Sequence, residues 1–196
     1  RLMRTCDPLP TGASRPTNFL TLGLISLVLS LAAIAHSEIR AETPSPSAVA
    51  SAPYELGTVV SFATGGESKK FTQTGWGDAE TEFTWTTGQS AKLLFKFAPS
   101  PEPLKLRMRL AGFLHPPGLT SQPVEILANS QKVAAWQVSG AAEFTATIPA
   151  ALAQTGALNI EIKTPKAASP KALGVSDDAR VLGVSCYEVE LERAAP

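Results

Sequence analysis

The 196-residue sequence contains only two cysteines and two histidines, and 17% of its residues are charged. So few thiol and imidazole ligands leave little for a metal centre or a framework of disulfides. Basic and acidic residues balance at 17 each and form no basic block, so the sequence predicts no nucleic-acid-binding surface. G-x-S-x-G, Walker and dinucleotide-binding glycine patterns are also missing. We therefore expect no metal, no cofactor and no catalytic residue.

Long hydrophobic runs are confined to one segment, the uncharged stretch from Phe19 to Ala35, which follows Arg1, Arg4 and Arg15. A basic leader before an apolar core is typical of a secretory signal peptide, and small residues near its end offer cleavage sites. The run of 17 residues also reaches the lower limit for a transmembrane helix, so a retained anchor is the alternative. The side chains that would then face the lipid are Phe19, Leu20, Leu22, Leu24, Ile25, Leu27, Val28, Leu29, Leu31 and Ile34.

The chain divides into three parts by composition. Residues 1–41 hold the predicted signal peptide or single membrane anchor, residues 42–53 form a linker rich in Pro, Ser and Ala, and residues 54–193 form a folded domain. Because basic residues precede the apolar run, the leader stays inside and the rest is exported in either case. We therefore expect a domain that is periplasmic, or periplasm-facing and membrane-anchored.

From Tyr54 onward, hydrophobic residues recur with a period of two. Leucines and a methionine alternate with cations along Leu104–Leu110, and the same rhythm runs through Lys92–Phe97 and Leu158–Lys163. This period is typical of half-buried β-strands, and roughly nine such strands separated by turn residues indicate a sandwich or barrel. The prediction is an all-β, two-layer antiparallel β-sandwich of jelly-roll or carbohydrate-binding-module type, preceded by one N-terminal hydrophobic helix.

Two details of this sandwich are predicted as well. Val124–Ala128 and Lys132–Val138 flank Asn129, which tolerates the left-handed conformation of a tight turn, so the two segments are expected to form a hairpin. Cys186 lies in the apolar segment VLGVSCYEVEL, and we expect it to be buried as a small hydrophobic residue.

The segment Gly75–Thr86 combines two tryptophans with three carboxylates. In the functional interpretation, Trp76 stacks on a sugar ring while Asp78 or Glu80 accepts hydrogen bonds from its hydroxyls, because a flat apolar face with directional acceptors suits a pyranose. In the alternative, Trp85 belongs to the core and Trp76 closes one end of the sandwich. Paired carboxylates would also suit glycoside hydrolysis, which is a third interpretation.

A second polar segment, Ser176–Arg180, precedes the last predicted strand. Arg180 beside aspartates predicts an ion pair that fixes this loop, since Arg–carboxylate pairs are common in folded proteins. The alternative is that Arg180 presents its guanidinium to a ligand. The candidate ligand-binding residues are therefore Trp76, Asp78, Glu80 and Arg180, with no catalytic residue and no metal ligand among them.

Motifs spread along residues 54–192 carry a resemblance to a known module. They are Leu56-Gly57, Ser61-Phe62, Gly75-Trp76 with Glu80, Thr84-Trp85-Thr86, Asn129 in the hairpin, and the ending Ser169-Pro170 with Leu173–Val184. Together they resemble a β-sandwich module found at the C-terminal, exported end of bacterial membrane proteins related to sugar and phosphoglycerol transferases. The resemblance implies a non-catalytic accessory module associated with glycans.

The sequence thus predicts an exported, non-catalytic binding or accessory module at the bacterial cell envelope, with carbohydrate as the leading ligand class. Its partner would be an envelope glycan or a membrane protein, and the membrane itself if the N-terminal segment is not cleaved. The alternative is a structural accessory subunit of a multi-subunit membrane complex. In that case a retained N-terminal transmembrane helix anchors the chain, and the sandwich braces a partner on the periplasmic side.

Overall fold

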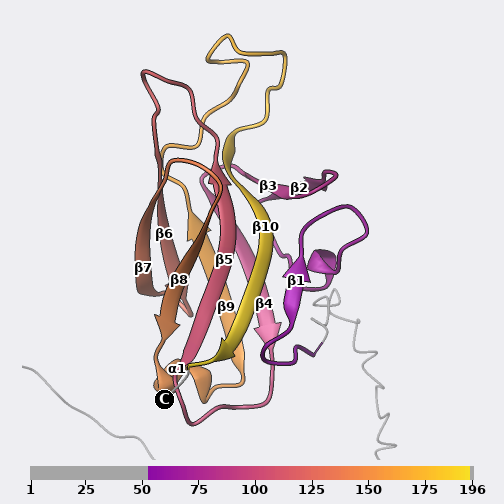
Figure 1. The fold of residues 1–196 in the computed structure, drawn as a ribbon, viewed down its shortest axis with the longest axis vertical. Coiled ribbons are helices and arrows are strands. Elements are labelled where there is room, and N and C mark those ends of the chain that lie inside the picture. Colours follow the sequence, from indigo (N-terminus) through magenta and orange to yellow (C-terminus); the bar gives the residue numbers. More distant parts are fainter. Residues whose placement is uncertain (1–52, 195–196) are drawn as a thin grey trace, which may run out of the picture. The chain divides into compact units, whose positions relative to one another are not determined.

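Two antiparallel β-sheets packed face to face make up the part of the chain that the computed structural model describes, residues 53–194 (Figure 1). This confirms the predicted all-β, two-layer antiparallel sandwich. The predicted leader, its lipid-facing side chains and the linker before Pro53 lie outside the described residues. Within residues 53–194, no helix is both long and apolar enough to span a membrane.

Ten strands and two short helical turns follow one another in the described residues. In chain order they are β1 (Val59–Ser61), η1 (Ser68–Lys70), β2 (Trp76–Ala79), β3 (Thr84–Thr87), β4 (Ser90–Lys96), β5 (Leu104–Gly112), β6 (Gln122–Ala128), β7 (Gln131–Val138), β8 (Ala142–Ile148), α1 (Ala150–Ala153), β9 (Ala157–Lys163) and β10 (Leu182–Arg193).

The larger sheet has the order β2-β3-β10-β5-β8, and the smaller has the order β4-β9-β6-β7. β10 lies at the centre of the larger sheet and pairs with β5 along most of its length. On its other side β10 pairs first with β3, up to Cys186, and then with β1, from Glu188 onward. Figure 1 shows β3 and β1 on the same side of β10, one beyond the other along the strand. On this side, β10 therefore changes its partner strand from β3 to β1 near its middle.

The core forms where the alternating faces of the two sheets meet. Leu104, Leu106, Met108 and Leu110 of β5 are fully buried, whereas the cations between them are not. The smaller sheet contributes the predicted inward residues of β4 and β9, which are Leu93, Phe95, Leu158, Ile160 and Ile162, and Phe97 directly after β4 is buried with them. Burying one such side chain contributes roughly 1.5–3 kcal/mol, so this double row is the main source of stability. The period of two thus identified both faces correctly.

The predicted hairpin and the predicted burial of Cys186 are both confirmed. Asn129 and Ser130 join β6 to β7 with φ angles of 47° and 70°, as a two-residue hairpin turn requires. The Asn129 side chain also accepts a hydrogen bond from the Asn159 amide at 2.8 Å and donates one to the Ala157 carbonyl at 3.0 Å. Cys186 is fully buried, and this burial raises the pKa of its thiol well above the usual value.

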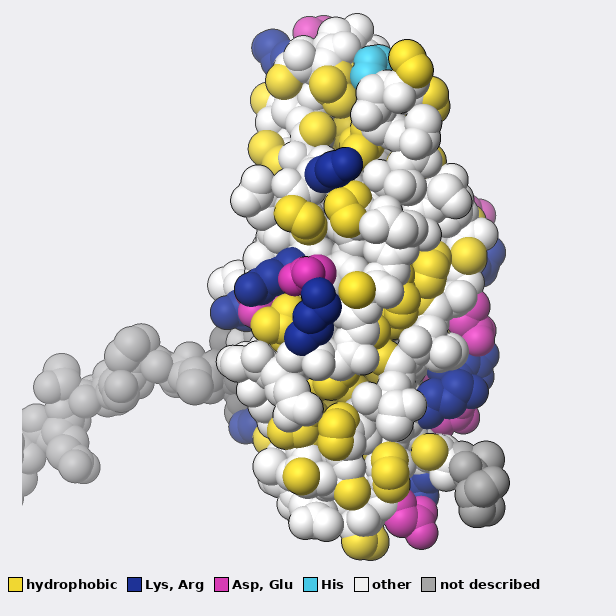
Figure 2. Space-filling model, turned by 90° about the vertical axis from the view of Figure 1, so that its left-hand side faces the viewer, with side chains coloured by type: hydrophobic (Ala, Val, Ile, Leu, Met, Phe, Trp, Pro, Cys, Tyr) yellow, Lys and Arg dark blue, Asp and Glu magenta, His cyan; other side chains and the backbone are white. Residues whose placement is uncertain are grey.

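Hydrophobic side chains gather along the side of the sandwich that Figure 2 presents. β7 and β8 are the edge strands of their respective sheets. Trp136 of β7 and Phe144 of β8 meet with their ring centroids 5.3 Å apart, and both pack against the core. This aromatic pair links the two sheets at their edge.

Candidate functional site

A β-bulge at the centre of the larger sheet, in β10, changes the direction of two side chains. Against β5, Cys186 pairs with Leu110 and Glu188 pairs with Arg109, so Tyr187 is an extra residue in β10. The buried face resumes at Val189. Tyr187 and Glu188 are therefore two consecutive side chains that both stay out of the core, one half-buried and one exposed. Bulges of this kind re-direct side chains and often lie next to functional sites.

The bulge coincides with the point where β10 exchanges β3 for β1. A hollow opens there between the end of β1, the β2–β3 turn and the outer face of β5 and β10. We refer to it as the bulge hollow. Its lining residues are Ser61, Ala63, Thr81, Glu82, Arg109, Tyr187 and Glu188. The hollow thus combines one phenol ring with two aliphatic hydroxyls, two carboxylates and one guanidinium.

The charged groups of the bulge hollow are not paired with one another. The Arg109 guanidinium lies 5.0 Å from the centre of the Tyr187 ring, in cation–π contact. Within residues 53–194, neither Arg109 nor Glu82 nor Glu188 takes part in an ion pair, although all three are exposed. Their hydrogen-bonding groups are therefore available to a ligand.

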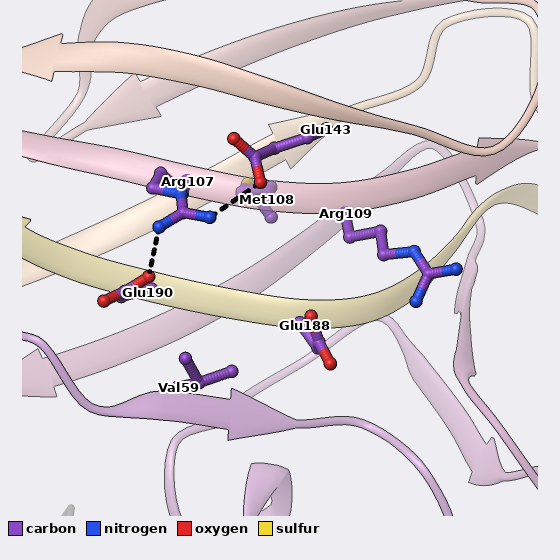
Figure 3. Close-up of a pocket in the computed structure, with 7 residues that line it drawn as sticks. All are labelled: Val59, Arg107, Met108, Arg109, Glu143, Glu188 and Glu190. Carbon is purple, nitrogen blue, oxygen red and sulfur yellow. Dashed lines mark hydrogen bonds and ion pairs between the residues drawn. The ribbon is translucent and has the colours of Figure 1, made fainter.

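The neighbouring charges on the same face of the sheet are paired, by contrast. Arg107 donates to Glu143 at 2.8 Å and to Glu190 at 3.0 Å, which joins β5 to the strands on both sides. Figure 3 shows this bridge, with Arg109 and Glu188 beside it and outside it. Hydrogen bonding to Arg107 lowers the pKa of Glu143. Arg109 and Glu188 differ from these neighbours, because neither forms an ion pair within residues 53–194.

An aromatic row extends the bulge hollow across the sheet. Phe83 lies 5.2 Å from Tyr187 and 5.5 Å from Trp85, and Trp85 lies 6.2 Å from Phe113, measured between ring centroids. All four side chains are half-buried, and none of them belongs to the core cluster. We call these four residues the aromatic row. A continuous aromatic surface outside the core suits the apolar face of a ligand.

The structure contradicts the interpretation of Trp85 as a core residue. Thr84 and Thr86 occupy the inward positions of β3, with 3% and 0% of their surfaces exposed. Their hydroxyls donate to the carbonyls of Phe62 and Val184, so burying them leaves no unsatisfied group. The predicted alternation of this strand is correct, but the two faces are exchanged.

Two of the four predicted ligand-binding residues come together in the structure. Arg180 contacts Asp178 at 2.7 Å and Glu80 at 3.5 Å, so the predicted ion pair of the loop is present. Hydrogen bonds from Arg180 lower the pKa of Asp178. A Cβ atom on Gly77 would lie 3.7 Å from the Arg180 guanidinium and 3.5 Å from Thr87.

We call Arg180, Asp178 and Glu80 the Arg180 cluster. Because the Arg180 guanidinium lies over Gly77, the cluster is on the same face of the sheet as the aromatic row. Thr87 alternates with the buried Thr86, as Trp85 does, so Thr87 and Trp85 point to the outer face.

The other two predicted residues have different surroundings. Trp76 is half-buried: its ring lies 4.9 Å from Phe62, and its indole N–H donates to the Lys92 carbonyl at 2.8 Å. It packs against the core cluster. Asp78 is exposed and lines a neighbouring hollow beside residues 63–69, which shares Ala63 with the bulge hollow. The ligand-binding role of Trp76, Asp78, Glu80 and Arg180 stays a prediction.

Sequence reasoning missed the bulge hollow, although a signal for it exists. The apolar positions of β10 run through Val184 and Cys186 and then resume at Val189 and Leu191. The spacing of three between Cys186 and Val189 breaks the period of two, and such a break indicates a bulge. The approach of Arg109 and Glu82 depends on strand pairing and has no local signal.

Comparison with known proteins gives distant structural likenesses. No protein-family model and no curated protein sequence matches the chain. The CBM36-1 domain of a multidomain xylanase from the hindgut metagenome of Trinervitermes trinervoides has 14% identity and a TM-score of 0.46, over 71% of this chain and 98% of that domain. A CBM36 carbohydrate-binding module, solved with calcium and xylotriose, has 13% identity and a TM-score of 0.42, over 69% and 99%.

A third structure, the C-terminal CBM6 of the marine laminarinase LamC from Zobellia galactanivorans, has 7% identity and a TM-score of 0.40, over 69% of this chain and 98% of that one. Likenesses at this level do not bear on ligands. The resemblance to a module of membrane sugar and phosphoglycerol transferases stays a prediction.

Proposed function

We propose that the sandwich is a non-catalytic carbohydrate-binding module that holds a glycan in the bulge hollow and along the aromatic row. The observation that carries this proposal is the bulge, which turns Tyr187 and Glu188 out of the core beside Arg109, a cation outside the ion pairs of the sheet. The C–H face of a sugar ring packs against an aromatic ring, and its hydroxyls donate to carboxylates and accept from a guanidinium. All three kinds of group line this one hollow.

A longer glycan would extend from the hollow past Trp85 to the Arg180 cluster. Arg180 and Glu80 lie on the same face of the sheet and are about two-fifths exposed, so they can still bind hydroxyls. Trp76 would support the site from below through its contact with Phe62. For Asp78, the Asp78→Asn variant tests whether its neighbouring hollow takes part.

The proposal is tested by calorimetric titration of the purified protein with a panel of envelope and plant oligosaccharides. Tyr187→Ala is expected to weaken binding by about tenfold, because truncating an aromatic contact residue removes its stacking surface. Phe144→Ala is the matched control: it also truncates a half-buried ring, but one at the β7–β8 edge. Its affinity is expected to equal that of the parent protein.

Three outcomes would contradict the proposal. The first is the absence of heat with every glycan of the panel. The second is an equal loss of affinity in Tyr187→Ala and Phe144→Ala, which would indicate a general effect on folding. The third is the release of new reducing ends during the titration, because a binding module leaves its glycan intact.

The cellular setting of the proposal rests on the sequence. The basic leader and the apolar run of residues 19–35 support export, and the linker supports a tethered domain at the cell envelope. The second candidate function is a structural subunit of a membrane complex, favoured by an apolar run long enough for a minimal transmembrane helix. The intact mass of the native protein separates the two, because only a retained anchor adds the residues before position 41.

A further inference from the structure

We infer that the bulge hollow selects glycans by charge and favours a glycan with free amino groups over one with carboxylates. This inference rests on the proposed function, because it names the class of glycan that the same site takes. It is argued from the charges that face the hollow and from how they are paired.

The first step is the balance of charge inside the hollow. Glu82 and Glu188 bring two negative charges and Arg109 brings one positive charge. Arg109 already lies over the Tyr187 ring. The lining of the hollow therefore carries a net charge of −1 when all three groups are ionised.

The second step concerns Arg109, the group that would have to recognise a carboxylate. Its direct cross-strand neighbours are Glu188 on β10 and Glu143 on β8. A ligand carboxylate that approached Arg109 would thus approach a glutamate on either side. An ammonium group at the same place would be attracted chiefly by Glu188, because Arg107 already pairs with Glu143.

The third step extends the argument along the face of the sheet. Arg107 is shared between Glu143 and Glu190, so this cluster has one more acid than base. The Arg180 cluster, with Asp178 and Glu80, has the same excess. Because the pKa of Glu143 and that of Asp178 are lowered by their arginines, both acids are ionised at neutral pH. A ligand lying on this face meets an excess of negative charge along its length.

The test uses three oligosaccharides of equal length and identical β-1,4 backbone. They are a glucose oligomer, a glucosamine oligomer and a glucuronate oligomer, titrated into the purified protein at low and at high salt and at about pH 6, where amino groups of the sugar are largely protonated and carboxylates are ionised. We expect the amino oligomer to bind about fivefold more tightly than the neutral one, and the uronate oligomer to bind most weakly. Salt is expected to narrow these differences, because it screens charges on an exposed face.

A variant links the preference to the hollow. Glu188→Gln removes one carboxylate and is expected to reduce the ratio of amino to uronate affinity by about threefold. Glu102→Gln is the control, because Glu102 is an exposed acid in the connection from β4 to β5 and does not line the hollow. It is expected to leave the ratio unchanged.

The outcomes separate the inference from the proposed function. Uronate binding at least as tight as neutral binding would overturn the inference and leave the binding function standing. The same holds for an amino-to-uronate ratio that Glu188→Gln does not change. Failure of all three oligomers to bind would overturn the inference, whereas the binding function itself is contradicted only if every glycan of the wider panel also fails to bind.

Discussion

At the scale of single residues, β3 shows that size does not decide which side chain is buried. Thr84 and Thr86 face inward because each hydroxyl donates to a backbone carbonyl, that of Phe62 for Thr84 and that of Val184 for Thr86. Trp85 faces outward and pairs across the sheet with Ser185, which is 2% exposed. The tryptophan therefore remains half-buried on the face where we place the glycan.

Gly183 is sensitive to substitution because it packs closely against two buried threonines. A Cβ atom at this position would lie 2.4 Å from the Thr164 hydroxyl and 2.8 Å from the Thr86 hydroxyl, and both threonines are fully buried. We expect Gly183→Ala to lower the free energy of unfolding by about 1–3 kcal/mol, as overpacking does in well-packed interiors. Urea unfolding monitored by tryptophan fluorescence measures the change.

A matched substitution isolates the steric cause. Gly140 has no atom within 4 Å of its Cβ position, so Gly140→Ala should leave the unfolding free energy within a few tenths of a kcal/mol of the parent value. If both variants lose equal stability, the contact with the two threonines does not account for the loss at Gly183.

At the scale of elements, the turn between β6 and β7 holds a serine where the backbone favours glycine. Ser130 has a φ of 70°, which is unfavourable for a residue with a side chain. Ser130→Gly creates the Asn-Gly sequence preferred in such turns. We expect it to raise the free energy of unfolding by about 0.5–1 kcal/mol, measured by thermal and urea unfolding.

Ser139 supplies the comparison for this prediction, because it is an exposed serine in the β7–β8 connection and has no positive φ. At this position the only effect of glycine is to raise the conformational entropy of the unfolded chain. Ser139→Gly should therefore leave the free energy of unfolding unchanged or lower it slightly. A gain of equal size at both positions would show that the left-handed turn is not its source.

Some of the strands and turns could be predicted from the sequence, and others could not. The strands β4, β5 and β9 and the turn at Asn129 follow from local patterns, because one face of each strand is apolar and one turn residue tolerates positive φ. The orientation of β3 could not be predicted, since a threonine and a tryptophan are both acceptable on either face until strand pairing supplies a carbonyl. The bulge hollow needs three strands and a turn to meet, and none of these contacts is local in sequence.

At the scale of the whole molecule, the first described residues are fastened to the last strand by one phenol. The single proton of the Tyr54 hydroxyl has two carbonyl acceptors in reach, Thr58 at 2.5 Å and Leu191 at 3.1 Å, and the oxygen accepts from the Leu191 amide at 2.8 Å. Its ring packs against Phe71 and Phe95 in the core. This contact joins the beginning and the end of the described chain to the same core.

Burial raises the pKa of Tyr54 to about 12, and the nearby carboxylates Glu190 and Glu192 act in the same direction. The unfolded chain releases this proton near pH 10, so the folded state holds the proton more tightly than the unfolded state does. The resulting stabilisation is complete below pH 10 and is lost as the pH rises from 10 to 12. It amounts to about 2–3 kcal/mol at most.

Urea unfolding of the parent protein and of Tyr54→Phe at a series of pH values tests this assignment. Below pH 10 the parent is expected to be the more stable protein, because the Tyr54→Phe variant leaves the Leu191 amide without its acceptor. Between pH 10 and 12 the advantage should shrink, since only the parent must ionise a buried phenol at this position, whereas lysines titrate in both proteins. A difference that stays constant up to pH 12 would mean that the Tyr54 hydroxyl has the same pKa in the folded and the unfolded chain. The contact between Tyr54 and Leu191 would then be open to water.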